Sequence, residues 1–174
     1  MARDVATGEL GFTRAEYDRL PEDFRAELVD GDLLKMGPPT VEHQRVLMRV
    51  LEALTRAAGW DRVLPGPAGF AVDAQTVLVP DALVLAAPPP ADAKDVSAAV
   101  LVVEVLSPST AARDRGVKAD KYLGAGVEEV WLVDPAARTV TVRRAKGAST
   151  HAEDDAAASR AVPGLRLVPA ELFA

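Results

Sequence analysis

A glutamate stands inside an apolar run of the kind that forms a buried strand. Residues 100–106 read Val-Leu-Val-Val-Glu-Val-Leu, with Glu104 near the middle. A buried carboxylate without a partner costs several kcal/mol or takes up a proton. It persists where a metal ion, a base or a catalytic task holds it. This run therefore predicts a central strand and a polar site built against it.

A second carboxylate, Asp81, follows the short apolar run at residues 76–80. Two acidic residues on neighbouring strands are a common way to hold a divalent cation. We therefore expect Asp81 and Glu104 to form the centre of a metal site. Asp81 could instead cap the turn after Pro80, and Glu104 could be a structural residue neutralised by Lys118 or an arginine.

Composition limits the chemistry of such a site. The chain has no cysteine, which excludes zinc–thiolate sites and thiol nucleophiles, and His43 and His151 are its two histidines. A site of three histidines within one chain is therefore impossible. Oxygen ligands remain, and these favour magnesium, manganese or calcium.

Length and charge set wider bounds. The 174 residues predict a single domain over 1–174, with its core over about 12–174. The polar start and the lack of an apolar run of about 20 residues predict a cytoplasmic protein with no membrane partner. The net charge of −6 counts against avid non-specific nucleic-acid binding but allows a local basic groove. Basic residues gather at residues 113–121 and 143–146, where solvated faces are the commoner interpretation.

The first half of the chain carries clear start and stop signals. Thr13 and Glu16 form a capping box that predicts a helix of about 6–8 residues ending near Pro21. An Asp30-Gly31 hairpin turn follows. A helix over residues 41–58 is predicted from its apolar stripe, with Thr40 as its cap and Gly59 as its end.

The second half predicts a strand over 99–106, a helix over 111–123 capped by the preceding Ser/Thr residues, and a hairpin of strands 127–134 and 139–143. Residues 145–160 are small and polar and predict an irregular, flexible segment. The fold class is α/β or α+β, with a mixed central β-sheet flanked by helices.

Short motifs occur in a fixed order along the chain. They are Pro80-Asp81, residues 103–110, Asp114-x-x-x-Lys118-x-x-x-Tyr122, and residues 126–134. Residues 27–31, the turn at 36–39, His43 and residues 163–165 add matches near both ends. In this order they resemble the Uma-type endonuclease-like family, a branch of the PD-(D/E)XK restriction-endonuclease-like superfamily.

The resemblance implies a restriction-endonuclease-like core and a magnesium site, with manganese as an alternative. Asp81 and Glu104 would be ligands, and the backbone carbonyl of Val105 a third. The standard lysine, two residues after the glutamate, is Leu106 here, and the family pattern places it at Lys118 instead. Glu27 resembles an acidic residue that adds a ligand or orients water.

The implied activity is hydrolysis of phosphodiester bonds in nucleic acid, with DNA favoured. Family members of this kind are often homodimers, and the hairpin over residues 131–142 is a candidate interface.

The helix that carries Lys118 supports and limits this interpretation. Four-residue spacing places Asp114, Lys118 and Tyr122 on one face, and Lys121 off it. Lys118 could also be a surface partner of Asp114, and Tyr122 a core residue with its hydroxyl in water. For His43 a structural hydrogen bond is favoured over a contact in a groove.

Two other functions stay open. A non-catalytic module on the same fold could bind nucleic acid or protein, as the net charge and the displaced lysine favour. A glycosidase could use Glu27 and Glu104 as an acid/base pair, although the aromatic content of 5% offers few stacking faces for sugars.

Overall fold

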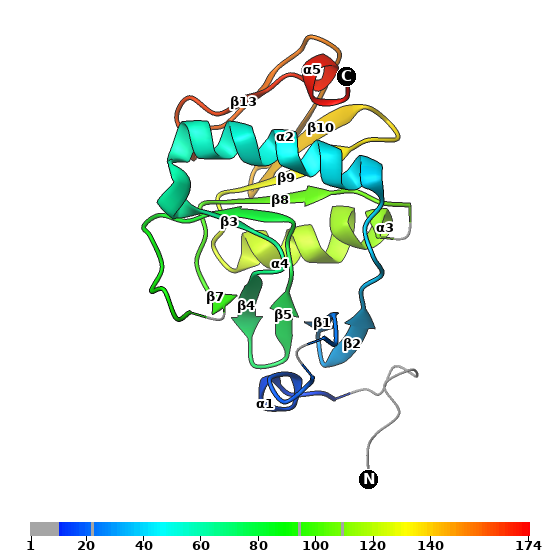
Figure 1. Cartoon of the computed structure of the whole chain (residues 1–174), viewed down its shortest axis with the longest axis vertical. Coiled ribbons are helices and arrows are strands. Elements are labelled where there is room, and N and C mark those ends of the chain that lie inside the picture. The colour runs from blue at the N-terminus through cyan, green and yellow to red at the C-terminus, as the bar shows by residue number, and fades with distance from the viewer. Residues whose placement is uncertain (1–10, 22, 94, 109) are drawn as a thin grey trace.

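The computed structural model describes residues 11–21, 23–93, 95–108 and 110–174. Within these residues, two large sheets, a separate two-stranded sheet and a few helices make up the fold (Figure 1). The larger sheet has the order β11-β10-β9-β8-β6-β3, and the smaller has the order β2-β1-β5-β4-β7. The larger sheet contains β3 (Val63–Pro65), β6 (Ala82–Val84), β8 (Leu101–Val105), β9 (Glu129–Asp134), β10 (Thr139–Arg144) and β11 (Gly147–Ala152). The smaller contains β1 (Ala26–Val29), β2 (Asp32–Lys35), β4 (Gly69–Asp73), β5 (Thr76–Leu78) and β7 (Asp95–Val96).

Helices cover both faces of the larger sheet. The long helix α2 (Val41–Ala58) crosses one face, and a helical segment running from α3 to α4 lies on the other (Figure 1). That segment consists of α3 (Ala111–Arg113), a π-helical turn η2 (Asp114–Lys118) and α4 (Ala119–Gly124). The remaining elements are α1 (Arg14–Tyr17), the 3₁₀ turn η1 (Trp60–Arg62), the β12 (Ala157–Ala158) and β13 (Arg166–Leu167) pair, and α5 (Pro169–Leu172).

The central strand β8 makes the larger sheet a mixed one. It pairs antiparallel with β6 and parallel with β9. In the β6–β8 ladder Ala82 lies opposite Val103, so Asp81 and Glu104 follow at the adjacent positions of the two strands. The predicted mixed sheet with flanking helices is confirmed, and it brings the two carboxylates of the sequence to neighbouring strands.

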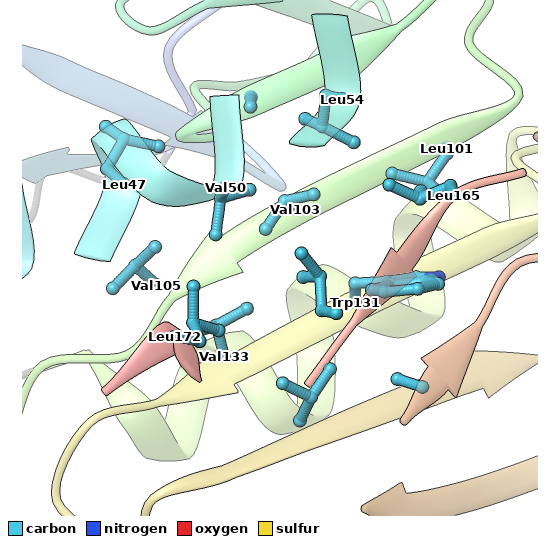
Figure 2. Close-up of a cluster of buried hydrophobic side chains, with 14 of the residues drawn as sticks. Leu47, Val50, Leu54, Leu101, Val103, Val105, Trp131, Val133, Leu165 and Leu172 are labelled. Carbon is cyan, nitrogen blue, oxygen red and sulfur yellow. The ribbon is translucent and has the colours of Figure 1, made fainter. Parts of the chain in front are cut away.

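Side-chain alternation along β8 decides which face Glu104 points to. Leu101, Val103 and Val105 belong to the core beneath α2, and Figure 2 shows Val103 beside Val50 and Val105 below Leu47 of that helix. Val102 and Leu106 belong to the other core, beneath α4. Because successive strand residues point to opposite faces, Glu104 projects toward η2 and α4.

Helix α2 begins and ends where its sequence signals predict. The Thr40 hydroxyl accepts a hydrogen bond from the backbone N–H of His43 at 3.1 Å, and Gly59 follows the last turn with φ +85°. The capping box of Thr13 and Glu16 is also present, but α1 is shorter than predicted. The Asp30-Gly31 turn is confirmed, with both residues at positive φ.

One other prediction is wrong. Residues 145–160 are not irregular, because β11 pairs with β10 over six positions and β12 pairs with β13. In the hairpin at 131–142, the side chains of Trp131, Val140 and Val142 are 0% exposed and pack inside this chain, and the homodimer interface there stays a prediction. At the start of the 111–123 helix, the Thr110 side chain makes no capping hydrogen bond and its hydroxyl contacts that of Ser107, while Ser109, another of the predicted capping residues, lies outside the described residues.

Candidate active site

A buried lysine lies at the centre of a cluster of acidic side chains. The Lys118 ammonium is 2.8 Å from Glu27 Oε1, 2.8 Å from Glu104 Oε1 and 3.2 Å from Asp114 Oδ1. All four side chains are at most 4% exposed. Burial lowers the pKa of Lys118, but the three carboxylates outweigh it and raise the pKa above its ordinary value. Lys118 therefore stays charged.

The π-helical turn explains how this lysine reaches the sheet. The five residues of η2 interrupt the predicted α-helix and end at Lys118. π-Helical turns are rare and frequently occur at functional sites. The spacing predicts that Asp114, Lys118 and Tyr122 share a face, and all three are buried, although the helix is not regular between them. Lys121 lies off this face and pairs with Asp30 at 2.6 Å, which confirms its predicted register.

The two carboxylate oxygens of Glu104 differ in their hydrogen-bond partners. Oε1 accepts a hydrogen bond from the Tyr122 hydroxyl at 2.7 Å and faces the Lys118 ammonium. Oε2 accepts no hydrogen bond from any residue that the structure describes. Burial raises the pKa of Glu104 well above its ordinary value, and Lys118 offsets this only in part. The Tyr122 hydroxyl is therefore bonded to a carboxylate, and the prediction that it lies in water is wrong.

Glu27 enters the cluster from the smaller sheet. Its side chain is 1% exposed, and Oε1 accepts a hydrogen bond from the Val79 backbone N–H at 2.9 Å. Arg113 approaches the other oxygen at 3.9 Å. Glu27 and Glu104 thus come together at the Lys118 ammonium, and the assisting role predicted for Glu27 stays a prediction.

Asp81 lies at the accessible edge of the cluster, with its side chain 22% exposed. Its Oδ2 accepts a hydrogen bond from the Val105 backbone N–H at 2.7 Å and lies 3.3 Å from His43 Nε2. The hydrogen bond to Asp81 raises the pKa of His43, which burial lowers. Asp81 therefore links the end of β6 to β8 and to the first turn of α2, and it does more than cap a turn.

Sequence reasoning undervalued several members of this cluster. The sequence favours a structural hydrogen bond for His43 and does not identify its partner, which is Asp81; it also leaves open a surface pair of Lys118 with Asp114, whereas that pair is buried. Arg113 was noted only as part of a basic stretch. The signal for His43 was its place in the first turn of a well-capped helix, but nothing local could show which strand end that turn meets.

The donor set fits a small, hard cation that is completed by solvent and substrate. Across the described residues, no three His, Asp or Glu side chains are grouped so as to hold a metal by themselves. Magnesium commonly uses only one or two carboxylates and takes its other ligands from water and phosphate. Asp81 and Glu104 meet this need, because each has one oxygen tied to the protein and one that accepts no hydrogen bond in the part of the chain described.

Electrostatics supports the same interpretation. The ion pairs connect four carboxylates, those of Glu27, Asp81, Glu104 and Asp114, with the side chains of Lys118, Arg113 and His43. Four negative charges against the two permanent positive charges leave an excess of two when His43 is neutral. The neighbouring carboxylates contribute, after burial, to the raised pKa of Glu104. A bound cation would remove this excess of negative charge.

This fold and site define the restriction-endonuclease-like class of nuclease folds. The model of the Uma2 family, described as "Putative restriction endonuclease", matches residues 14–170. The chain therefore belongs to the Uma2 family, which confirms the resemblance seen in its motifs.

A solved structure agrees on the fold. The crystal structure of a "putative nuclease belonging to DUF820" from Anabaena variabilis superposes with a TM-score of 0.79 at 22% sequence identity. The match covers 93% of this chain and 97% of that one. No curated protein matches the chain. In the part of the chain that is described, no helix is long and apolar enough to span a bilayer.

Proposed function

We propose that this chain is a magnesium-dependent nuclease that hydrolyses phosphodiester bonds, with DNA as its substrate. The observation that carries the proposal is the buried Lys118 ammonium held by Glu27 and Glu104 beside Asp81. The family and the fold support a nuclease-like activity. The cation, the substrate and the residue roles are the proposed part.

Asp81 and Glu104 would hold the cation, with the Val105 carbonyl as a third ligand. When bound, magnesium would lower the pKa of a water molecule and offset charge on the scissile phosphate. The charge of the magnesium ion would also reduce the repulsion between the site and its substrate, because a cluster with excess negative charge repels a phosphate diester.

Lys118 would stabilise the charge that develops on the phosphate or orient the attacking water. Its three carboxylate partners fix the ammonium before substrate arrives, so little reorganisation is needed during the reaction. Glu27 and Asp114 also contact the Lys118 ammonium, and Glu27 is itself fixed by the Val79 N–H. Tyr122 holds Glu104 Oε1 and leaves Oε2 for the cation.

The displaced lysine no longer favours a non-catalytic module, because Lys118 reaches Glu104 from the neighbouring helix. The glycosidase alternative also loses support. An acid/base pair needs room for a sugar between its carboxylates. Here Glu27 and Glu104 contact the same ammonium, which lies between them.

Two lysines on one helical segment provide a matched test. Supercoiled plasmid, single-stranded DNA and RNA are incubated with the protein in Mg²⁺, Mn²⁺ or EDTA. We expect cleavage of DNA with either metal and none in EDTA. Lys118→Met should remove cleavage, whereas Lys121→Met, which breaks the pair with Asp30 outside the cluster, should retain it.

Two outcomes would contradict the proposal. Cleavage that persists in Lys118→Met would remove the lysine from the mechanism. A folded wild type that cleaves none of the three substrates but retains DNA on a filter would favour the binding module. A homodimer remains a prediction, which light scattering on the same preparation checks.

A further inference from the structure

His43 contacts the site from an element that the proposed chemistry does not otherwise use. It belongs to the first turn of α2, where the Thr40 hydroxyl accepts its backbone N–H. Its side chain is 12% exposed, and Nε2 lies 3.3 Å from Asp81 Oδ2. The same oxygen accepts the Val105 N–H. One carboxylate oxygen is thus held from two directions, by a strand and by a helix.

The two atoms left over at this contact are informative. Asp81 Oδ1 accepts no hydrogen bond from the described residues. His43 Nδ1 is buried and has no hydrogen-bond partner among those residues. Unpartnered buried polar atoms are rare in folded proteins, and each calls for an explanation. The unpartnered Nδ1 is explained if the contact between Nε2 and Asp81 has a function that keeps the ring in this orientation.

We propose that His43 is a positioning residue that orients Asp81 for cation binding, by engaging Oδ2 and leaving Oδ1 to the ligand. This inference rests on the proposed metal-dependent function. Partners that orient ligating carboxylates typically change metal affinity or activity about 10–100-fold when removed. The same helix turn thereby couples the placement of α2 to the geometry of the metal site.

The variants separate the ring contact from the packing of the helix. His43→Leu keeps an apolar body of similar size but loses the donor. His43→Gln keeps an N–H near the place of Nε2. His151→Leu is the matched control, because His151 also contacts a carboxylate, that of Asp155 at 3.0 Å, but on β11. Thermal unfolding of each variant reports whether the fold survives.

The measurement is Mn²⁺ binding, followed by the loss of the free-ion EPR signal, for the protein alone and with a short DNA duplex. We expect His43→Leu to weaken Mn²⁺ binding about tenfold or more. His43→Gln should restore most of it, and His151→Leu should match the wild type. Rescue by glutamine is a result that a merely structural role would not give, since a hole or clash at residue 43 does not depend on an N–H.

The ring can also be observed directly. With two histidines in the chain, a long-range ¹H–¹⁵N NMR spectrum assigns each ring by comparison with His151→Leu. We expect His43 to carry its proton on Nε2, and this signal to change in Asp81→Asn. A proton on Nδ1 alone would overturn the contact itself.

The outcomes distinguish the inference from the function on which it rests. Wild-type protein that binds Mn²⁺ while folded His43→Leu binds it equally well would overturn the role of His43 and leave the nuclease proposal standing. Wild-type protein that binds no Mn²⁺ with or without the duplex would overturn both.

Discussion

Glu104 on β8 and Glu129 on β9 are both almost inaccessible, at 3% and 1% exposed, yet the protein holds them in different ways. Each oxygen of Glu129 accepts two hydrogen bonds. Oε2 accepts from Trp131 Nε1 and the Ser159 hydroxyl, and Oε1 accepts from Arg144 Nε and the Arg160 backbone N–H. Glu104 has one oxygen that shares Lys118 with two other carboxylates and one that accepts no hydrogen bond from the described residues.

The pKa shifts of the two residues go in opposite directions. Burial raises the pKa of Glu129, but its hydrogen bonds from Ser159 and the other donors outweigh this and lower the pKa below its ordinary value. Burial raises the pKa of Glu104, and Lys118 does not compensate fully. A saturated buried carboxylate stabilises a fold, whereas an unsaturated one retains capacity for a ligand. The difference supports the role proposed for Glu104 as a cation ligand.

The largest expected effect separates the two residues by activity. Glu104→Gln keeps the shape and the Tyr122 contact but removes the charge that would hold a cation, so we expect plasmid cleavage to fall about 10³-fold. Glu129→Gln should cleave DNA at nearly the wild-type rate per folded molecule. Cleavage rates in Mg²⁺ under single-turnover conditions check this. Equal losses in both variants would mean that the fold, and not the charge at residue 104, limits activity.

The second largest expected effect is on the stability of the fold, and it concerns Glu129. Replacing Glu129 with glutamine leaves Arg144 without a charged partner and places an amide group among four donors. Breaking a buried charge pair by removing one member costs about 3–5 kcal/mol. We expect a loss of this size in the free energy of unfolding by urea. Ala136→Ser, in the turn between β9 and β10, serves as a neutral control. A loss below about 1 kcal/mol would contradict the assigned role.

The comparison also shows what local sequence can predict. The end signals of α2 and the apolar run around Glu104 are local, and both predictions agree with the structure. The spacing of Asp114, Lys118 and Tyr122 predicted a shared face, and all three are buried. These features depend on residues within one or two turns or on one strand, where propensity and alternation apply.

The network around Glu129 could not be predicted in the same way. Ser159 and Arg160 come from a stretch whose small and polar residues predicted an irregular segment. Its strand β11 is mostly exposed and carries few β-branched residues, so pairing with β10 overrides its weak propensity. The His43–Asp81 contact likewise joins residues far apart in sequence, and only the packing of α2 on the sheet brings them together.

The opposite pKa shifts predict opposite dependences of stability on pH. For Glu129, with its pKa lowered on folding, the stabilisation is present above the unfolded value and is lost as pH falls through the folded one. For Glu104, with its pKa raised, the contribution is present below the unfolded value and is lost as pH rises through the folded one. Relative to wild type in EDTA, Glu104→Gln should therefore gain stability as pH rises from about 5 to about 8.

Over a lower range, the destabilisation caused by Glu129→Gln should shrink as the solution is acidified toward the folded pKa of Glu129. Urea unfolding at a series of pH values measures both trends. If the unfolding free energies of the two variants changed with pH in the same direction, the two glutamates would share one type of electrostatic environment, and the contrast between them would be wrong.

The smallest expected effect compares two hydroxyl donors, one for each glutamate. Tyr122→Phe removes the donor to Glu104 but leaves Lys118 at the same oxygen and creates no unpartnered atom on the ring, so we expect a loss of at most about 1 kcal/mol. Ser159→Ala removes a donor to Glu129 and also deprives the Val162 N–H of its acceptor, so about 1–3 kcal/mol should be lost. Urea unfolding at neutral pH compares them. If Tyr122→Phe proved the more costly, Glu104 would depend on its hydroxyl partner as a saturated carboxylate does, and the capacity assigned to its second oxygen would lose its basis.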